Sequence, residues 1–163
     1  MGSRFLFSAA GVLLILCWLL YFVWLHSPIV KALTVVGWMT WAVGLVLVFV
    51  PMVVLRAKGA PQKGKSFVHT TVVVDSGVYA VVRHPLYLGW SLMYVAVMFF
   101  SQHWLVVAIG GLGVACTALI SGQEDRRLIE KFGAAYKAYM KSVPAMNLFA
   151  GTVRLLKRKR KRE

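Results

Sequence analysis

The sequence predicts an all-α integral membrane protein with four membrane-spanning helices, and three observations favour this fold class. Of the 163 residues, 60% are hydrophobic and only 15% are charged, whereas soluble domains are roughly 45–50% apolar. The hydrophobic residues gather in long uncharged runs, which is typical of membrane spans. The formal net charge is nevertheless +14. Together these features exclude a disordered chain, a disulfide-rich secreted scaffold and an ordinary soluble enzyme.

The first two spans are predicted over residues 5–25 and 33–55. The first is an uncharged run of 21 residues, and a helix of that length crosses a hydrocarbon core of about 30 Å. We interpret it as a span rather than a signal peptide because it is longer than an h-region and no small-x-small cleavage site follows. In the second span, Pro51 is expected to kink or end the helix.

A long loop over residues 56–83 joins the second span to the third. Its first part is basic and rich in Gly and Pro, and residues 67–74 are largely β-branched and extended in character. Asp75-Ser76-Gly77 is a turn signal. Because ordered loops of this length are usually functional, we expect this one to contribute to a site.

The third and fourth spans are predicted over residues 84–101 and 104–121, as a tightly turned helical hairpin. Their apolar stretches lie at or below the limit of about 17 residues for a spanning helix. A re-entrant pair that does not fully cross is therefore the alternative. Gly110, Gly111 and Gly113 are expected to let another helix approach closely.

The C-terminal part is polar and is predicted to form a helix over residues 123–142, followed by a basic tail over residues 153–163. Leu128, Phe132 and Tyr136 recur at helical spacing on one face, which indicates an amphipathic helix. We expect the tail to bind anionic membrane lipids rather than nucleic acid, because no nucleic-acid-binding fold is recognisable.

The distribution of positive charge predicts the orientation. With four spans, 18 of the 19 Lys and Arg residues fall on one side, and only Lys31 falls on the other. The positive-inside rule then places both termini, the 56–83 loop and the C-terminal helix in the cytoplasm. Three or five spans would divide these charges between the two sides.

Two groups of residues on the predicted cytoplasmic face are candidates for chemistry. At the start of the third span, Pro85 is expected to begin a helix whose free N–H groups, together with His84, suit a carboxylate or phosphate. Glu124 lies on the same face as the apolar stripe and needs a partner, for which Arg127 at i+3 is the candidate. The alternative is that Glu124 only stabilises a helix dipole. No metal-ligand spacing is found, and both cysteines lie in apolar runs.

These residues belong to a two-part motif. It reads Tyr79-x-x-x-Arg83-His84-Pro85-x-Tyr87-x-Gly89, then a helical hairpin, then Glu124-Asp125-x-x-Leu128-x-x-x-Phe132-Gly133-x-x-Tyr136-x-x-Tyr139. In this order and separation it resembles the isoprenylcysteine carboxyl methyltransferase and phospholipid methyltransferase family, whose members are integral membrane enzymes that use S-adenosylmethionine. The resemblance covers roughly residues 62–146.

The resemblance implies an S-adenosylmethionine site and names its residues. The implied cofactor contacts are Val72, Val73, Val74, Tyr79, His84, Pro85, Leu86, Tyr87 and Glu124. We predict Glu124 and its partner Arg127 as the catalytic residues. The family usually has Glu-Glu where this chain has Glu124-Asp125, which leaves open which acid makes the contact.

The function that follows is methyl transfer to a lipid-like or lipidated acceptor at the cytoplasmic membrane face. A carboxylate acceptor needs an arginine to place it, and the candidates are Arg83, Arg126 and Arg127. An amine acceptor needs a base, such as Glu124, Asp125 or a tyrosine. Two alternatives are kept: an NADPH-dependent membrane reductase of the sterol or steroid type, and a non-enzymatic scaffold that binds anionic lipid.

Overall fold

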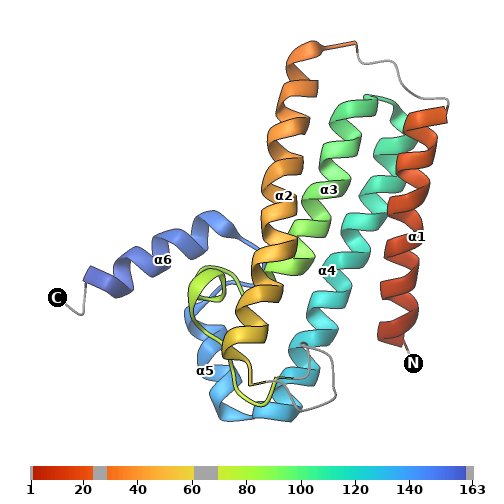
Figure 1. The fold of residues 1–163 in the computed structure, drawn as a ribbon. Helices are drawn as coiled ribbons and strands as arrows, with labels where there is room; N and C mark the ends of the chain where they lie inside the picture. Colours follow the sequence, from red (N-terminus) through yellow and green to blue (C-terminus); the bar gives the residue numbers. More distant parts are fainter. Residues whose placement is uncertain (1, 24–28, 61–69, 161–163) are drawn as a thin grey trace. The chain divides into compact units, whose positions relative to one another are not determined.

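The computed structural model describes residues 2–23, 29–60 and 70–160, and the regular elements within these ranges are helices joined by loops (Figure 1). The helices are α1 (Gly2–Val23), α2 (Lys31–Lys58), α3 (Pro85–Ser101), α4 (Trp104–Phe132), α5 (Ala134–Ser142) and α6 (Leu148–Arg160), with a short 3-10 helix, η1, at Gly77–Ala80. No strand occurs in the described part of the chain. The predicted all-α class is thereby confirmed.

Three of the described helices, α1, α2 and α4, are long and apolar enough to cross a membrane. The predicted third span corresponds to α3, an apolar helix of 17 residues that is shorter than these three. Many large apolar side chains of α1 and α2 point outward, including Phe5, Phe22 and Phe49. Such exposure suits a hydrocarbon surrounding, because lipid tails are as apolar as these side chains.

The helix boundaries differ from the prediction at three places. Helix α2 contains Pro51 but continues to Lys58, so the proline does not end it. The helix expected to begin at residue 123 is not separate, because α4 runs without a break to Phe132. The break comes instead at Gly133, whose φ of 57° lies in the left-handed region that glycine adopts without strain.

Helix α6 was not predicted, because its sequence was interpreted as a basic tail. Its first turn is stabilised by Asn147, whose side-chain Oδ1 accepts a hydrogen bond from the Ala150 N–H at 2.9 Å. A side chain that accepts from an otherwise unpaired N–H is a typical N-cap. The signal was therefore present in the sequence just before the charged run.

The chain divides into two compact units, and each is described here by itself. Unit 1 comprises Met1–Leu47 and Tyr87–Gln123, and unit 2 comprises Val48–Leu86 and Glu124–Glu163. Helices α2, α3 and α4 each contribute residues to both.

Unit 1 packs α1, α3 and α4 around buried Tyr94, whose hydroxyl donates to the Ala10 carbonyl. Small residues allow this packing: a Cβ added at Gly113 would overlap the Tyr94 ring, and one at Gly110 would contact the Met98 side chain. The prediction of close approach is confirmed at these two glycines. At Gly111 a Cβ would meet open space, so that position does not need a glycine for packing.

The turn between α3 and α4 is as tight as predicted, since only two residues separate the helices. Gln102 adopts a positive φ of 51° there, which is uncommon for a residue other than glycine. Its side chain makes two hydrogen bonds of 2.8 Å each with the backbone N–H and carbonyl of Val30. These bonds fasten the turn to the start of α2.

Unit 2 has a separate core of buried Tyr136, Tyr139 and Val143. The end of α4 packs against it through Leu128, Ile129 and Phe132, the loop before η1 through Val73, and α5 itself adds Met140. The stripe of apolar residues predicted along residues 128–140 therefore faces this core, although it is divided between two helices.

Candidate functional site

A cavity of about 60 Å³ opens in unit 2 beside this core. It is lined by residues from the end of α2, the loop before η1, η1 itself, the end of α4 and α5. They are Leu55, Thr70, Val72, Val73, Val74, Tyr79, Arg83, Leu128, Phe132, Tyr136 and Tyr139. The lining is mainly apolar and aromatic, with Arg83 as its one charged residue.

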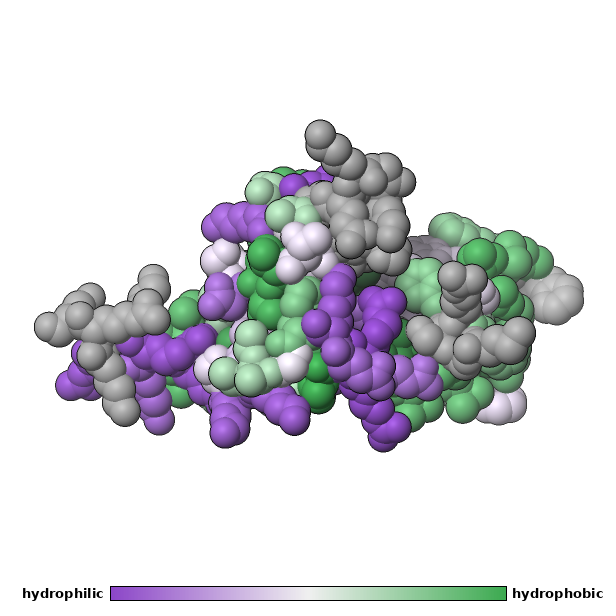
Figure 2. Space-filling model, turned by 90° about the horizontal axis from the view of Figure 1, so that it is seen from below, coloured by the Kyte–Doolittle hydropathy of each residue, from purple (hydrophilic) through white to green (hydrophobic). Residues whose placement is uncertain are grey.

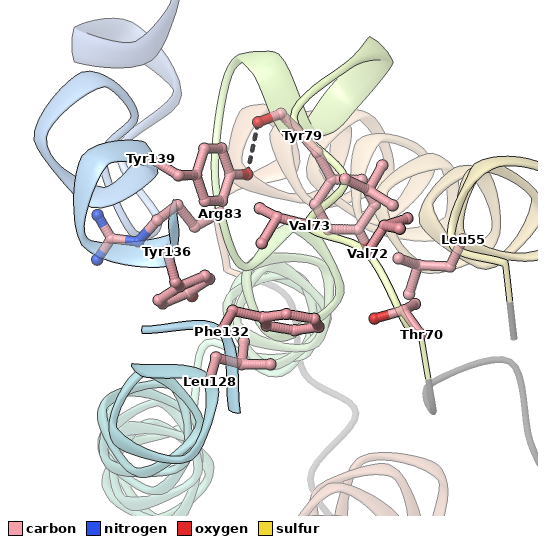
Figure 3. Close-up of a pocket in the computed structure, with 11 residues that line it drawn as sticks. Leu55, Thr70, Val72, Val73, Tyr79, Arg83, Leu128, Phe132, Tyr136 and Tyr139 are labelled. Carbon is pink, nitrogen blue, oxygen red and sulfur yellow. Dashed lines mark hydrogen bonds between the residues drawn. The ribbon is translucent and has the colours of Figure 1, made fainter. Parts of the chain in front are cut away.

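Figure 3 shows how these side chains surround the cavity. Phe132 and Leu128 form one wall, Tyr136 and Tyr139 a second, and Val72 and Val73 face them from the loop. The Tyr139 hydroxyl donates to the Tyr79 carbonyl at 2.6 Å, which joins α5 to η1. Flat rings on one side and branched aliphatic side chains on the other suit a planar ring between them.

Asp125 is the centre of a hydrogen-bond network behind the cavity. Its Oδ2 accepts from Arg83 Nη2 at 2.8 Å, and its Oδ1 lies 2.7 Å from His84 Nε2 and accepts from the Tyr136 hydroxyl at 2.6 Å. The Arg83 side chain is 9% exposed and that of Asp125 is 13% exposed. A largely buried carboxylate with three partners fixes them in place, because losing any bond leaves a poorly solvated polar group.

Arg83 also ends α5. Its Nη1 donates to the carbonyls of Met140 and Val143, at 3.1 and 2.6 Å. The last carbonyls of a helix lack intrahelical partners, and a cation there complements the helix dipole. Arg83 and Asp125 thus join the segment between η1 and α3 to α4 and α5 through one ion pair.

The backbone next to this pair is joined to the chain beyond α5. The N–H groups of Arg83 and His84 donate to the carbonyls of Pro144 and Ala145, at 2.9 and 3.0 Å. The segment that enters α3 is therefore held by both its side chains and its backbone. Its conformation depends on residues some 60 positions away, which no local pattern reveals.

The two tyrosines on α5 stay protonated and act as donors. Burial raises the pKa of Tyr136 above its ordinary value, and the hydrogen bond to Asp125 raises it further. Burial also raises the pKa of Tyr139. A neutral hydroxyl at each position keeps the bonds to Asp125 and to the Tyr79 carbonyl intact across the physiological range.

The structure brings together only part of the predicted set of site residues. The cavity is lined by four of them, Val72, Val73, Val74 and Tyr79. His84 does not line it but contacts Asp125 through Nε2. Pro85 is buried as the first residue of α3, as expected, and Leu86 follows it. Tyr87 belongs to unit 1.

Glu124 and Arg127 form an ion pair of their own at 2.5 Å, with the Arg127 side chain 57% exposed. Neither residue lines the cavity in unit 2. Of the two adjacent acids, whose roles the sequence left open, Asp125 is the one that bonds to His84 and Arg83.

Sequence reasoning did not assign Leu55, Thr70, Leu128, Phe132, Tyr136 and Tyr139 to the site. The last four were recognised as an apolar face and attributed to packing. They do pack, and their exposed edges also line the cavity. The signal was the aromatic content of that face, with three rings in eight residues.

Comparison with known proteins agrees with the motif. The sequence profile of the phospholipid methyltransferase family matches residues 32–135. A protein-S-isoprenylcysteine O-methyltransferase of Dictyostelium discoideum is 29% identical over 131 residues, which are 74% of this chain and 52% of that protein. A human protein of the same name is 38% identical over 88 residues, 51% of this chain and 29% of that protein.

A third relative, methanethiol S-methyltransferase 2 of Bradyrhizobium diazoefficiens, is 37% identical over 75 residues, 45% of this chain and 28% of that protein. The chain therefore spans about half or less of the length of these curated relatives. No solved structure matches it. The family profile covers well over half of the chain, including the first part of the motif and the second part as far as Gly133. The chain therefore belongs to the phospholipid methyltransferase family.

Proposed function

We propose that the protein is an S-adenosylmethionine-dependent methyltransferase acting on a lipid-like or lipidated acceptor. The observation that carries the proposal is the cavity of unit 2, lined by residues of both parts of the family motif. Family membership implies S-adenosylmethionine as the methyl donor. The curated relatives carry names of O- and S-methyltransferases, so the proposal does not specify the acceptor atom.

The chemistry of the lining fits part of this cofactor. Val72 and Val73 face Phe132 and Tyr136 across the cavity (Figure 3), an arrangement that suits the adenine ring. A pocket for a whole ligand of this size is usually ~300 Å³ or more, against about 60 Å³ here. We therefore propose that this cavity holds one flat group of the cofactor. The remainder of the cofactor is proposed to contact His84, Pro85, Leu86, Tyr87 and Glu124.

In this proposal the residues of the chain act by binding and orienting. When bound, S-adenosylmethionine supplies a methyl group that the adjacent sulfonium has already activated. Asp125 holds His84 and Arg83 in place, so that the entry to α3 keeps one conformation. Glu124 accepts hydrogen bonds from the cofactor and Arg127 orients a carboxylate acceptor, and alignment of donor and acceptor supplies most of the rate gain.

We further propose the four-span topology of the sequence, with α3 as the third span and both termini on the cytoplasmic side. The distribution of Lys and Arg supports this orientation. The 56–83 loop, the polar part of α4, and α5 then share one face with the site, and the basic tail from residue 153 meets anionic lipid there. A lipophilic acceptor reaches such a site from the bilayer.

Titration of the detergent-solubilised protein with S-adenosylhomocysteine tests the cofactor. We expect binding that His84→Ala weakens about tenfold or more, because this change removes the contact between Asp125 and the residue that precedes α3. His103→Ala, in the turn between α3 and α4, is the matched control and should bind as the wild type does. Absence of binding, or binding of NADPH instead, would refute the proposal.

Incubation of membranes with radiolabelled S-adenosylmethionine then identifies the acceptor class. Label in extracted lipid indicates a phospholipid amine or another small lipophilic acceptor. Label in protein that base treatment releases indicates a carboxyl methyl ester. Label in neither fraction would argue against a lipophilic acceptor.

A further inference from the structure

Helix α6 presents two faces of different character, and the first of them contacts η1. Gly151, Leu155 and Arg158 follow one another at i, i+4 and i+7, so they lie on one side of the helix. A Cβ on Gly151 would overlap the Val81 carbonyl oxygen. Arg158 donates through Nη2 to the Ala80 carbonyl at 2.6 Å. This side of α6 is therefore fitted to the backbone at the end of η1.

The opposite face of α6, which we call the outer face, carries unpartnered apolar side chains. It comprises Phe149, Val153 and Leu156, again at i, i+4 and i+7. Phe149 is 81% exposed and Leu156 is 61% exposed. Lys157 and Arg160 are exposed beside them. Figure 2 shows hydrophilic and hydrophobic surface side by side toward the C-terminal end of the chain.

We propose that the outer face of α6 binds the surface of an anionic lipid bilayer and that this binding fixes the position of η1. A helix with apolar residues on one side and Lys and Arg beside them lies in the interface plane of a membrane. The charges select anionic headgroups. Exposed Phe and Leu need a hydrocarbon layer, which a nucleic acid or an acidic protein tail does not offer.

The same contacts connect this membrane surface to the cavity in unit 2. η1 is held on one side by α6, through Gly151 and Arg158, and on the other by the Tyr139 hydroxyl on the Tyr79 carbonyl. The Tyr79 side chain lines the cavity. An α6 that is held on the bilayer therefore holds one wall of the cavity, whereas an undocked α6 leaves that wall fixed from one side only.

Hydrogen exchange of the protein in lipid nanodiscs tests the inference directly. The discs contain phosphatidylcholine alone or phosphatidylcholine with phosphatidylglycerol. We expect the amides of residues 148–160 and of 77–83 to exchange about tenfold or more slowly in the anionic discs. Each basic residue near an anionic surface adds roughly a fivefold factor to membrane binding, so Lys157→Glu with Arg160→Glu should abolish this protection.

Two control variants separate a defined face from general charge attraction. Lys137→Glu with Lys141→Glu makes the same charge change on exposed positions of α5 and should keep the protection. Phe149→Ser with Leu156→Ser should lose it, and Phe149→Leu with Leu156→Ile should retain it. Equal exchange in both kinds of disc, or equal loss in the α5 variant, would overturn the inference.

The affinity for S-adenosylhomocysteine in the same discs tests the connection to the cavity, and only this measurement rests on the proposed function. We expect binding several-fold tighter in anionic discs, with the difference lost in Phe149→Ser with Leu156→Ser. Protection of α6 without binding of S-adenosylhomocysteine in any disc would refute the proposed function while leaving the membrane face intact. Binding that does not depend on the lipid, despite protection of α6, would refute the connection.

Discussion

Replacing Asp125 with Asn tests whether the buried network holds unit 2 together. The substitution preserves shape and one acceptor oxygen but removes the charge that Arg83 and His84 face. A hydrogen bond to a charged group contributes about 1.5–3 kcal/mol, and removing one partner of a buried ion pair costs ~3–5 kcal/mol. Because Asn retains part of the bonding, we expect a loss of about 2–3 kcal/mol in the free energy of opening of unit 2.

The neighbouring acid provides the matched control. Glu124→Gln removes the same charge one residue earlier, but its partner Arg127 has a side chain that is 57% exposed. Exposed ion pairs contribute ~1 kcal/mol or less. The free energy of opening of unit 2 should therefore fall clearly more in Asp125→Asn than in Glu124→Gln, although both substitutions replace an acid with its amide.

Hydrogen exchange followed by mass spectrometry distinguishes the two units. A loss of about 2–3 kcal/mol accelerates exchange in peptides covering residues 77–84 and 134–143 by roughly 30- to 150-fold, since 1.4 kcal/mol is a factor of ten. All six tryptophans lie in the segments of unit 1, so tryptophan fluorescence reports on that unit alone and should change little. Equal exchange in Asp125→Asn and Glu124→Gln would refute the role assigned to Asp125.

Two other substitutions are informative. Gly113→Ala puts a Cβ into the Tyr94 ring and should cost about 1–3 kcal/mol of stability through overpacking. Thermal unfolding followed by tryptophan fluorescence should show a lower midpoint. The control Gly111→Ala, whose Cβ meets open space, should leave the midpoint unchanged. Tyr139→Phe removes the donor to the Tyr79 carbonyl and should lower the stability of unit 2 by ~1–3 kcal/mol. We expect faster hydrogen exchange at residues 77–83 and weaker binding of S-adenosylhomocysteine. Unchanged exchange at these residues would show that this bond does not hold η1.

The extent to which the sequence predicted the helices follows from how local each signal is. Apolar runs and their lengths depend only on neighbouring residues, so α1, α2, α3 and the apolar part of α4 were expected close to their observed bounds. Pro85 and the close-packing glycines are local signals of the same kind. The end of α4 was missed because polar residues continue a helix as readily as they begin one, and only the positive φ of Gly133 ends it.

The candidate site was predicted in part, and the division has a physical reason. The motif alone pointed to residues 72–74, Tyr79 and His84, because their order in the chain is the signal. It did not distinguish Glu124 from Asp125, since adjacent helix positions differ only in the direction of their side chains. The structure distinguishes them because Arg83, His84 and Tyr136, which are 11 to 42 residues away in the sequence, all bond to Asp125.

The sequence by itself determined the helical class, the membrane character, the family and most of one wall of the cavity. Each of these depends on composition, periodicity or the order of a motif, which folding does not change. Only the tertiary structure shows which of the two acids bonds to Arg83, His84 and Tyr136, that Arg83 caps the end of α5, and that α6 packs against η1. Those features depend on contacts between distant segments, where burial turns an ordinary polar residue into a fixed partner.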